Sequence, residues 1–288
     1  MHFIIMLKIA VQKSGRLSEG SIDLLKKCGL KFTNGHNQLM TPVQNYDAQI
    51  LFLRDDDIPH YVQDGVADVG IIGENVFLEH QANVDVVKKL GFSKCRVSLA
   101  IPKNEKYTGI DFFDGKKIAT SYPHILKSFL ENHGLKAGIH SISGSVEIAP
   151  GIGLADAIMD IVSTGSTLLS NGLKEVETVL VSEAILISSL SLDDQQKQQL
   201  EQLLFRIEAV LRARDFKYIL LNAPNDRIED IVSILPGMKS PTVLPLAESG
   251  WSSIHSVMSE SKFWENIDQL KNLGAQGILI VPIEKMVL

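Results

Sequence analysis

Residues 156–168 read DAIMDIVSTGSTL, an apolar run that passes directly into consecutive hydroxyl and glycine positions before a predicted short helix. Gly165 lets the backbone approach an anion closely, and the amides of residues 164–167 with the neighbouring hydroxyls can surround a phosphate. Asp160 suits ribose hydroxyls better than a phosphate. The stretch therefore predicts a sugar-phosphate site in an α/β fold; the alternative is a Ser/Thr-rich turn with an incidental capping aspartate.

Strand-like and helix-like segments alternate on both sides of this stretch, which is typical of α/β architecture with mainly parallel sheets. The pattern predicts two lobes joined by a double crossover with a cleft between them. Lobe I takes residues 1–102 and 185–212, and lobe II takes residues 103–184. Strands are predicted at residues 7–11, 49–53, 69–73, 97–102, 117–120 and 178–188, and helices at 18–28, 58–65, 123–133, 155–161 and 192–215.

From residue 213 onward the pattern starts afresh. Strands are predicted at 216–221, 242–246, 252–258 and 277–281, and helices at 226–235 and 261–273. The order βαββαβ is that of the ferredoxin-like split motif. A small unit of this kind after a long amphipathic helix indicates ligand sensing or assembly, with a purely structural appendage as the alternative.

Composition excludes several classes of protein. The 288 residues are too many for one ordinary core, and a net charge of −6 argues against a protein that coats nucleic acid. Cys28 and Cys95 lack metal or redox spacing and are expected to be reduced thiols. The apolar start lacks a basic segment and a cleavage site, and no apolar run approaches the roughly 20 residues of a membrane span. We therefore expect a cytoplasmic protein.

Residues 153–168 resemble the phosphoribosyl-pyrophosphate (PRPP) loop of the ATP phosphoribosyltransferase family, the first enzyme of histidine biosynthesis. Other blocks match this family in the expected order and together span nearly the whole chain. They are residues 12–17, 53–59, 65–73, 90–97 and 144–150. Residues 222–224, 240–246 and 281–285 resemble the long form of the family.

The resemblance implies a two-lobed, periplasmic-binding-protein-like catalytic core and a C-terminal ferredoxin-like regulatory domain over residues 213–288. The implied reaction is a glycosyl transfer that joins N1 of the ATP adenine to C1 of the PRPP ribose and releases pyrophosphate. Mg²⁺ is expected to enter with the substrate phosphates, with no metal ligand assigned to the protein. The family further implies inhibition by histidine, competition by AMP at the ATP site, and a homohexamer.

Site residues are carried over position by position from this resemblance. The predicted PRPP-binding residues are Asp160, Ser163, Thr164, Gly165, Ser166 and Thr167. The predicted ATP-binding residues are Lys8, Lys13, Ser14, Gly15, Arg16, Arg54, Asp68 and Arg96. The predicted catalytic residues are Glu147, Asp160 and Arg16, where a carboxylate stabilises an oxocarbenium-like centre electrostatically. The predicted neighbours of inhibitory histidine are Asn222, Met238, Ser240, Thr242 and Gly277.

Other interpretations remain open from the residues alone. Each cation taken singly fits a solvated surface position, and Asp68 fits a structural role as well as a binding one. Asp57 before Ile58-Pro59 is interpreted as a helix cap rather than an Mg²⁺ ligand, and the scattered histidines do not form a metal site. The rival functions are a two-lobed small-molecule-binding or effector-sensing module without catalysis and a phosphoribosyltransferase for another base.

Overall fold

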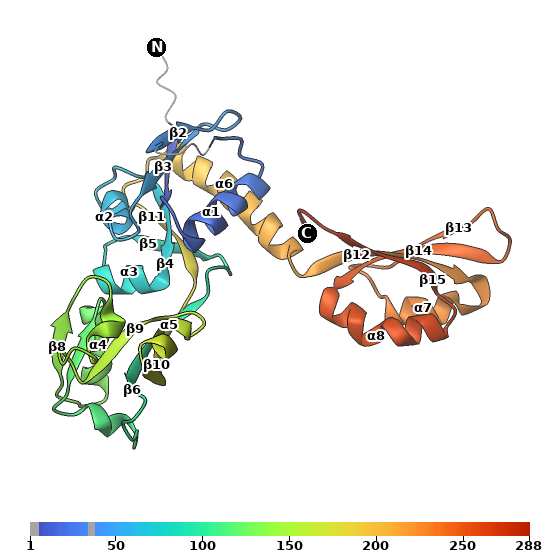
Figure 1. The fold of residues 1–288 in the computed structure, drawn as a ribbon. Helices are drawn as coiled ribbons and strands as arrows, with labels where there is room; N and C mark the ends of the chain where they lie inside the picture. The colour runs from blue at the N-terminus through green and yellow to red at the C-terminus, as the bar shows by residue number, and fades with distance from the viewer. Residues whose placement is uncertain (1–5, 34–37) are drawn as a thin grey trace, which may run out of the picture. The chain divides into compact units, whose positions relative to one another are not determined.

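The computed structural model describes residues 6–33 and 38–288. The chain divides into two compact units, residues 1–200 and 201–288. The first unit contains two sheets, which define lobe I and lobe II, and the second contains one (Figure 1). No helix in the described part of the chain is long and apolar enough to cross a membrane.

Lobe I is built on a six-stranded sheet in the order β2-β3-β1-β4-β11-β5, in which β3, β1 and β4 run parallel. The strands are β1 (Leu7–Gln12), β2 (Met40–Pro42), β3 (Ala48–Leu53), β4 (Val69–Gly73), β5 (Asp85–Lys89) and β11 (Ala184–Ser188). The central strands are buried nearly throughout, as expected for parallel strands covered on both faces. The helices are α1 (Arg16–Lys27), α2 (Ile58–Gln63) and α3 (Glu74–His80).

Lobe II is built on a five-stranded sheet in the order β10-β6-β9-β7-β8, in which β9, β7 and β8 run parallel. The strands are β6 (Cys95–Pro102), β7 (Lys117–Thr120), β8 (Gly138–Ser141), β9 (Ala157–Val162) and β10 (Leu173–Ser182). The helices are α4 (Pro123–Asn132) and α5 (Ser166–Ser170), with 3₁₀ turns η1 (Ile110–Phe113) and η2 (Val146–Ile148). The chain enters lobe II before β6 and returns after β10, and the two crossings meet where the Ala184 amide donates to the Phe92 carbonyl at 2.9 Å.

Two sequence predictions in this unit are wrong. Residues 155–161 were expected to be helical, but residues 157–162 form strand β9, because it lies between β6 and β7, where strand pairing and burial on both faces decide the conformation. Residues 178–188 form parts of two strands, with the break at Glu183 marking the crossing between lobes. Strands β2, β5 and β8 were not predicted, because they are short and carry few buried side chains.

The C-terminal unit contains β12 (Phe216–Pro224), α7 (Ile228–Ile234), β13 (Thr242–Pro245), β14 (Trp251–Ser259), α8 (Glu260–Asn272) and β15 (Gln276–Pro282). The strand order β13-β14-β12-β15 confirms the predicted split βαββαβ motif. Both helices cover one face of this sheet (Figure 1), where Ile219, Leu221, Ile254 and Phe263 form the core. The long helix α6 (Asp194–Ala213) precedes the motif, and the division between the compact units falls inside it.

Candidate active site

The loops that follow the parallel strands of the two lobes meet at one place. Residues 13–16 follow β1, and Ser163 follows β9. Arg16 Nη1 donates a hydrogen bond to Ser163 Oγ at 2.7 Å, a contact between residues 147 positions apart. Ligands of open α/β sheets bind at the carboxyl ends of the strands, so this junction is the expected place for substrates.

The predicted phosphate loop lies between β9 and α5. Gly165 adopts a φ of 80°, which favours glycine, and it immediately precedes α5. Thr164 Oγ1 lies 3.0 Å from Ser166 Oγ, and the side chains of Ser163, Thr164, Ser166 and Thr167 are exposed. Because α5 has only five residues, the loop amides and hydroxyls would supply most of an anion's hydrogen bonds.

Asp160 lies on β9 just before this loop, and its charge is disfavoured in the free protein. Burial raises the pKa of Asp160 to about 6, and the charge of Glu147 adds to the rise. The Ile161 amide donates to Asp160 Oδ1 at 2.7 Å, which partly opposes it. Burial also raises the pKa of Tyr122, with the Asp160 charge as the second cause, so Tyr122 lies near this carboxylate. A ligand that donates hydrogen bonds to this carboxylate would lower its pKa and favour its charged form.

Arg96 holds the backbone of the predicted phosphate loop. Its guanidinium donates to both carboxylate oxygens of Glu175 at 2.5 Å and to the Ser163 carbonyl at 3.2 Å. Glu175 raises the pKa of Arg96, and Arg96 lowers the pKa of Glu175. The structure thus places Arg96 at the phosphate loop, where it holds backbone, rather than among the loops of lobe I.

Lys13 and Arg54 come together in lobe I. The Lys13 amide donates to the carbonyl of Leu53, the residue before Arg54, at 2.7 Å. Lys13, Ser14, Gly15, Arg16 and Arg54 are all exposed. Gly15 has a φ of 93° and forms the N-terminal boundary of α1, so the loop turns sharply over the end of the sheet. Three cations therefore gather at the carboxyl ends of β1 and β3.

A cavity of about 570 Å³ is lined by residues of both lobes and includes Asp55, which directly follows Arg54. Asp55, Asp56 and His80 line it from lobe I, and Ser121 and Tyr122 line it from lobe II. Burial and the neighbouring Asp56 raise the pKa of Asp55. None of these lining residues was singled out as a site residue from the sequence. Residues 121 and 122 could have been found because they follow the predicted strand 117–120, at the edge where ligands bind.

Comparison with known proteins now decides the family. Residues 54–209 match the model for ATP phosphoribosyltransferase, and residues 213–285 match the model for its C-terminal domain. The ATP phosphoribosyltransferase of Azobacteroides pseudotrichonymphae is 60% identical over 283 residues, which cover 98% of this chain and all of the relative. The chain belongs to the ATP phosphoribosyltransferase family. The match to the C-terminal domain shows that the chain is the long form of the family. The activity of the enzyme is transfer of a phosphoribosyl group from PRPP to ATP, the first step of histidine biosynthesis.

Two further similarities agree with this family. The ATP phosphoribosyltransferase of Bacteroides fragilis is 56% identical over 283 residues, 98% of this chain and all of the relative. A solved ATP phosphoribosyl transferase (HisG:HisZ) complex from Thermotoga maritima superposes with a TM-score of 0.62 at 29% identity, covering 72% of this chain and 98% of that one. The resemblance to the ATP phosphoribosyltransferase family that the sequence blocks indicated is therefore confirmed.

Lys8 and Asp68 lie apart from the other predicted ATP-binding residues. They lie at the amino ends of β1 and β4, whereas Lys13, Arg16 and Arg54 follow the carboxyl ends of parallel strands. Asp68 is 4% exposed and accepts hydrogen bonds from the Lys8 amide at 2.6 Å and from Gln196 Nε2 at 2.7 Å. Burial raises its pKa. Through these two hydrogen bonds Asp68 ties β1 to α6, and the assignment of Lys8 and Asp68 to the ATP site stays a prediction.

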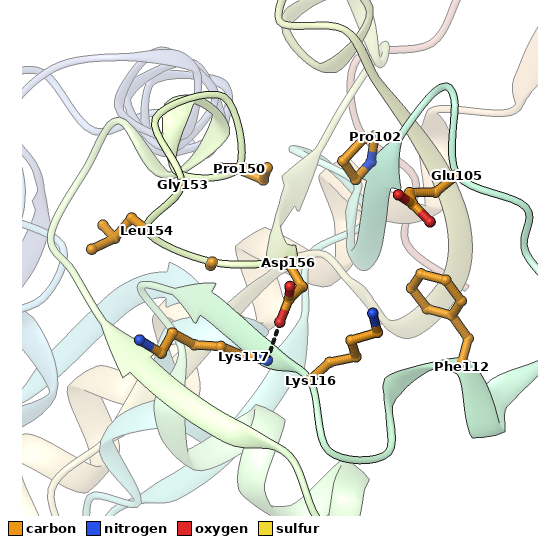
Figure 2. Close-up of a pocket in the computed structure, with 10 residues that line it drawn as sticks. Pro102, Glu105, Phe112, Lys116, Lys117, Pro150, Gly153, Leu154 and Asp156 are labelled. Carbon is orange, nitrogen blue, oxygen red and sulfur yellow. Dashed lines mark hydrogen bonds between the residues drawn. The ribbon is translucent and has the colours of Figure 1, made fainter.

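A second cavity, of about 370 Å³, lies at the amino ends of β7 and β9 (Figure 2). Lys116 Nζ lies 5.3 Å from the centre of the Phe112 ring, and the Lys117 amide donates to Asp156 Oδ2 at 2.8 Å. The predicted phosphate loop follows the other end of β9, so this cavity is separate from that loop.

The structure also bears on the predictions for Asp57 and for the two cysteines. Asp57 occupies the N-cap position of α2, as predicted, but its side chain makes no capping hydrogen bond within the described part of the chain. Within the described residues, neither Cys28 nor Cys95 takes part in a disulfide.

The predicted histidine neighbours fall in the C-terminal unit. Asn222 lies on β12 between Leu221 and Ala223, whose side chains face the helices, so Asn222 points to the open face of the sheet. Gly277 comes so close that a Cβ built on it would lie 3.3 Å from Asn222 Nδ2. Thr242 pairs with His255, also on the open face. Met238 and Ser240 are exposed in the segment before β13.

Proposed function

We propose that Asp160 and residues 163–167 hold PRPP, and that Lys13, Ser14, Gly15, Arg16 and Arg54 hold ATP across the cleft. The hydrogen bond from Arg16 to Ser163 supports this assignment most directly, because it joins the two blocks in one place. Asp160 would accept hydrogen bonds from the ribose hydroxyls, and the loop amides would bind the 5′-phosphate. The predicted lobe boundary moves, because β6 (Cys95–Pro102) pairs within the sheet of lobe II. We therefore assign residues 1–94 and 183–212 to lobe I, residues 95–182 to lobe II and residues 213–288 to the regulatory domain.

In this arrangement the protein acts by positioning and by electrostatics. The lone pair of adenine N1 forms a bond to C1 of the ribose, and the C1–O bond breaks with its electron pair leaving on pyrophosphate. The carboxylates of Asp160 and Glu147 would stabilise positive charge on the ribose ring in the transition state. Arg16 lies between the two binding blocks and would bring the polyanionic substrates together, which contributes through orientation.

Mg²⁺ fits this site as a companion of the substrate phosphates. Over residues 6–33 and 38–288, no group of three or more His, Cys, Asp or Glu side chains could hold a metal ion, so a dedicated cage is not part of the described structure. When bound with PRPP, Mg²⁺ would neutralise charge on the departing pyrophosphate.

We also propose how histidine and AMP inhibit the enzyme. Histidine would bind at the open face of the C-terminal sheet near Asn222, Thr242 and Gly277, with Met238 and Ser240 beside it, and AMP would compete at the ATP site. Inhibition at a distance requires two global states with different affinities for histidine, which a homohexamer would provide. We place the enzyme in the cytoplasm, where ATP and PRPP are available.

A matched pair of glycine substitutions tests the PRPP assignment. Gly165 and Gly172 have similar positive φ values, 80° and 70°, and a Cβ on either meets no atom closer than 3.9 Å. Gly165→Asp adds a carboxylate to the phosphate loop and should weaken PRPP binding by calorimetry at least about tenfold, because the added negative charge repels the phosphate. Gly172→Asp, at the other end of α5, should bind PRPP as the wild type does. Equal binding by both variants would overturn the assignment.

A further inference from the structure

Helix α3 carries two buried polar side chains that the reaction does not use. Asn75 is 4% exposed and Glu79 is 8% exposed. They are four residues apart, so they lie one above the other on the same face of the helix. A buried carboxylate is costly unless its hydrogen bonds are satisfied, so its partners reveal its role.

Within the described residues, Glu79 makes its hydrogen bonds to the beginning of α4, in the other lobe. Its carboxylate accepts hydrogen bonds from the His124 amide at 3.0 and 3.1 Å and from the Ile125 amide at 3.1 Å. It also lies 3.1 Å from His124 Nδ1. Glu79 thus satisfies the first free amides of α4, because Pro123 has none and Tyr122 caps nothing with its side chain within the described residues. A carboxylate is the favoured charge at a helix N-terminus.

Asn75 makes the second connection from α3. Its Nδ2 donates to the Tyr122 hydroxyl at 3.3 Å. Its own amide donates to Ser182 Oγ at 3.0 Å, and Ser182 donates back to Asn75 Oδ1 at 2.9 Å. Ser182 is the last residue of β10, where the chain returns to lobe I. Asn75 is therefore bonded to the segment where the chain passes back to lobe I, and it also contacts Tyr122 of lobe II.

Asn75 contacts Tyr122 directly, and Glu79 contacts His124 and Ile125 just after it in the chain. Tyr122 directly precedes α4, lines the cleft cavity, and is close enough to Asp160 for that carboxylate to raise its pKa. A shift at the beginning of α4 would therefore move Tyr122 relative to Asp160. Small displacements of positioning groups have large effects on rate.

We propose that Glu79 and Asn75 are positioning residues that hold the beginning of α4, and with it Tyr122, against lobe I, and so set the geometry of the PRPP side of the cleft. The proposal rests on the assignment of PRPP to Asp160 and the phosphate loop. Neither residue contacts the reacting atoms; both act through α4.

Glu79→Gln is the test, because glutamine keeps the shape but removes the charge and replaces one acceptor with a donor that faces the amides. Hydrogen exchange followed by mass spectrometry or NMR should show the His124 and Ile125 amides exchanging about tenfold faster, as expected for loss of a charge-assisted hydrogen bond. The Leu126 amide, which donates to the Tyr122 carbonyl at 3.0 Å, serves as the reference within the helix. The KM for PRPP should rise more than the KM for ATP.

Glu131→Gln is the matched control, since it makes the same change on the exposed side of α4, where Glu131 lies 3.9 Å from Lys127. It should alter neither exchange nor kinetics. If Glu79→Gln folds poorly, Glu79→Asp keeps the charge but withdraws it from the amides, and the same measurements apply. Protected amides in the Glu79 variant, or faster exchange with an unchanged KM for PRPP, would overturn the proposal. The PRPP assignment fails separately if PRPP does not protect residues 163–167 of the wild type.

Discussion

Replacing Asp160 by asparagine should make the free protein more stable while it weakens the use of PRPP. The pKa of Asp160 is about 6 in the folded protein and near 3.8 in the unfolded chain, because folding buries the carboxyl near Glu147. Between these pH values the folded state keeps a proton that the unfolded state releases. The wild type therefore loses stability as pH rises from about 4 to 6, and above that range the penalty is complete.

The size of the effect follows from the pKa difference. A gap of about two pKa units corresponds to about 3 kcal/mol, which partial exposure of the side chain reduces to about 1–3 kcal/mol. Asparagine keeps the acceptor for the Ile161 amide, so the main change is removal of the buried charge. At about 3 °C per kcal/mol for a unit of this size, the Tm at pH 7.5 should rise by roughly 5 °C.

Catalysis should change in the opposite direction. Loss of a charged acceptor for ribose hydroxyls should lower kcat/KM for PRPP about a hundredfold. The acid limb of the wild-type profile, a fall in kcat/KM for PRPP below about pH 6, should disappear in Asp160→Asn.

Differential scanning calorimetry at pH 4 and pH 7.5 and initial rates from pH 5 to 8 measure both effects. Asp156→Asn is the control, since Asp156 is exposed just before the other end of β9. The reasoning is refuted if Asp160→Asn has a lower Tm than the wild type at pH 7.5, or if its kcat/KM for PRPP matches that of Asp156→Asn.

Two other predictions concern the loop support and the regulatory unit. Glu175→Gln should raise the KM for PRPP about fivefold. Arg96 then loses a partly exposed ion pair worth about 1 kcal/mol and holds the Ser163 carbonyl less firmly. An unchanged KM in steady-state assays would contradict the idea that Arg96 and Glu175 support the loop. Asn222→Ala should raise the histidine concentration for half-inhibition about tenfold, because a buried hydrogen bond to the ligand is lost. Asn266→Ala, on helix α8, should be inhibited like the wild type, and equal inhibition of both variants would exclude Asn222 from the site.

Much of the fold could be predicted from the sequence where local pattern and tertiary environment agree. The strands 69–73 and 117–120 have the predicted bounds, and Gly29 ends α1 with a φ of 85°, as its position after the predicted helix indicates. The prediction failed for residues 155–161, whose apolar spacing fits a helix as well as a strand. Pairing with β6 and β7 selects the strand, and that pairing is invisible in a single sequence.

The proposed phosphate loop could be predicted from the sequence because its chemistry is contiguous. An acidic residue, hydroxyls and a glycine lie within eight positions, and the chain alone brings them together. Its partners are distant in the sequence. Only the tertiary structure decided that Arg16 reaches Ser163 and that Glu175 holds Arg96 at the loop. It also decided that Lys8 and Asp68 lie at the opposite edge of their sheet. The physical reason is that local composition determines which groups can bind an anion, whereas the direction and pairing of the strands determine which groups face the same cleft.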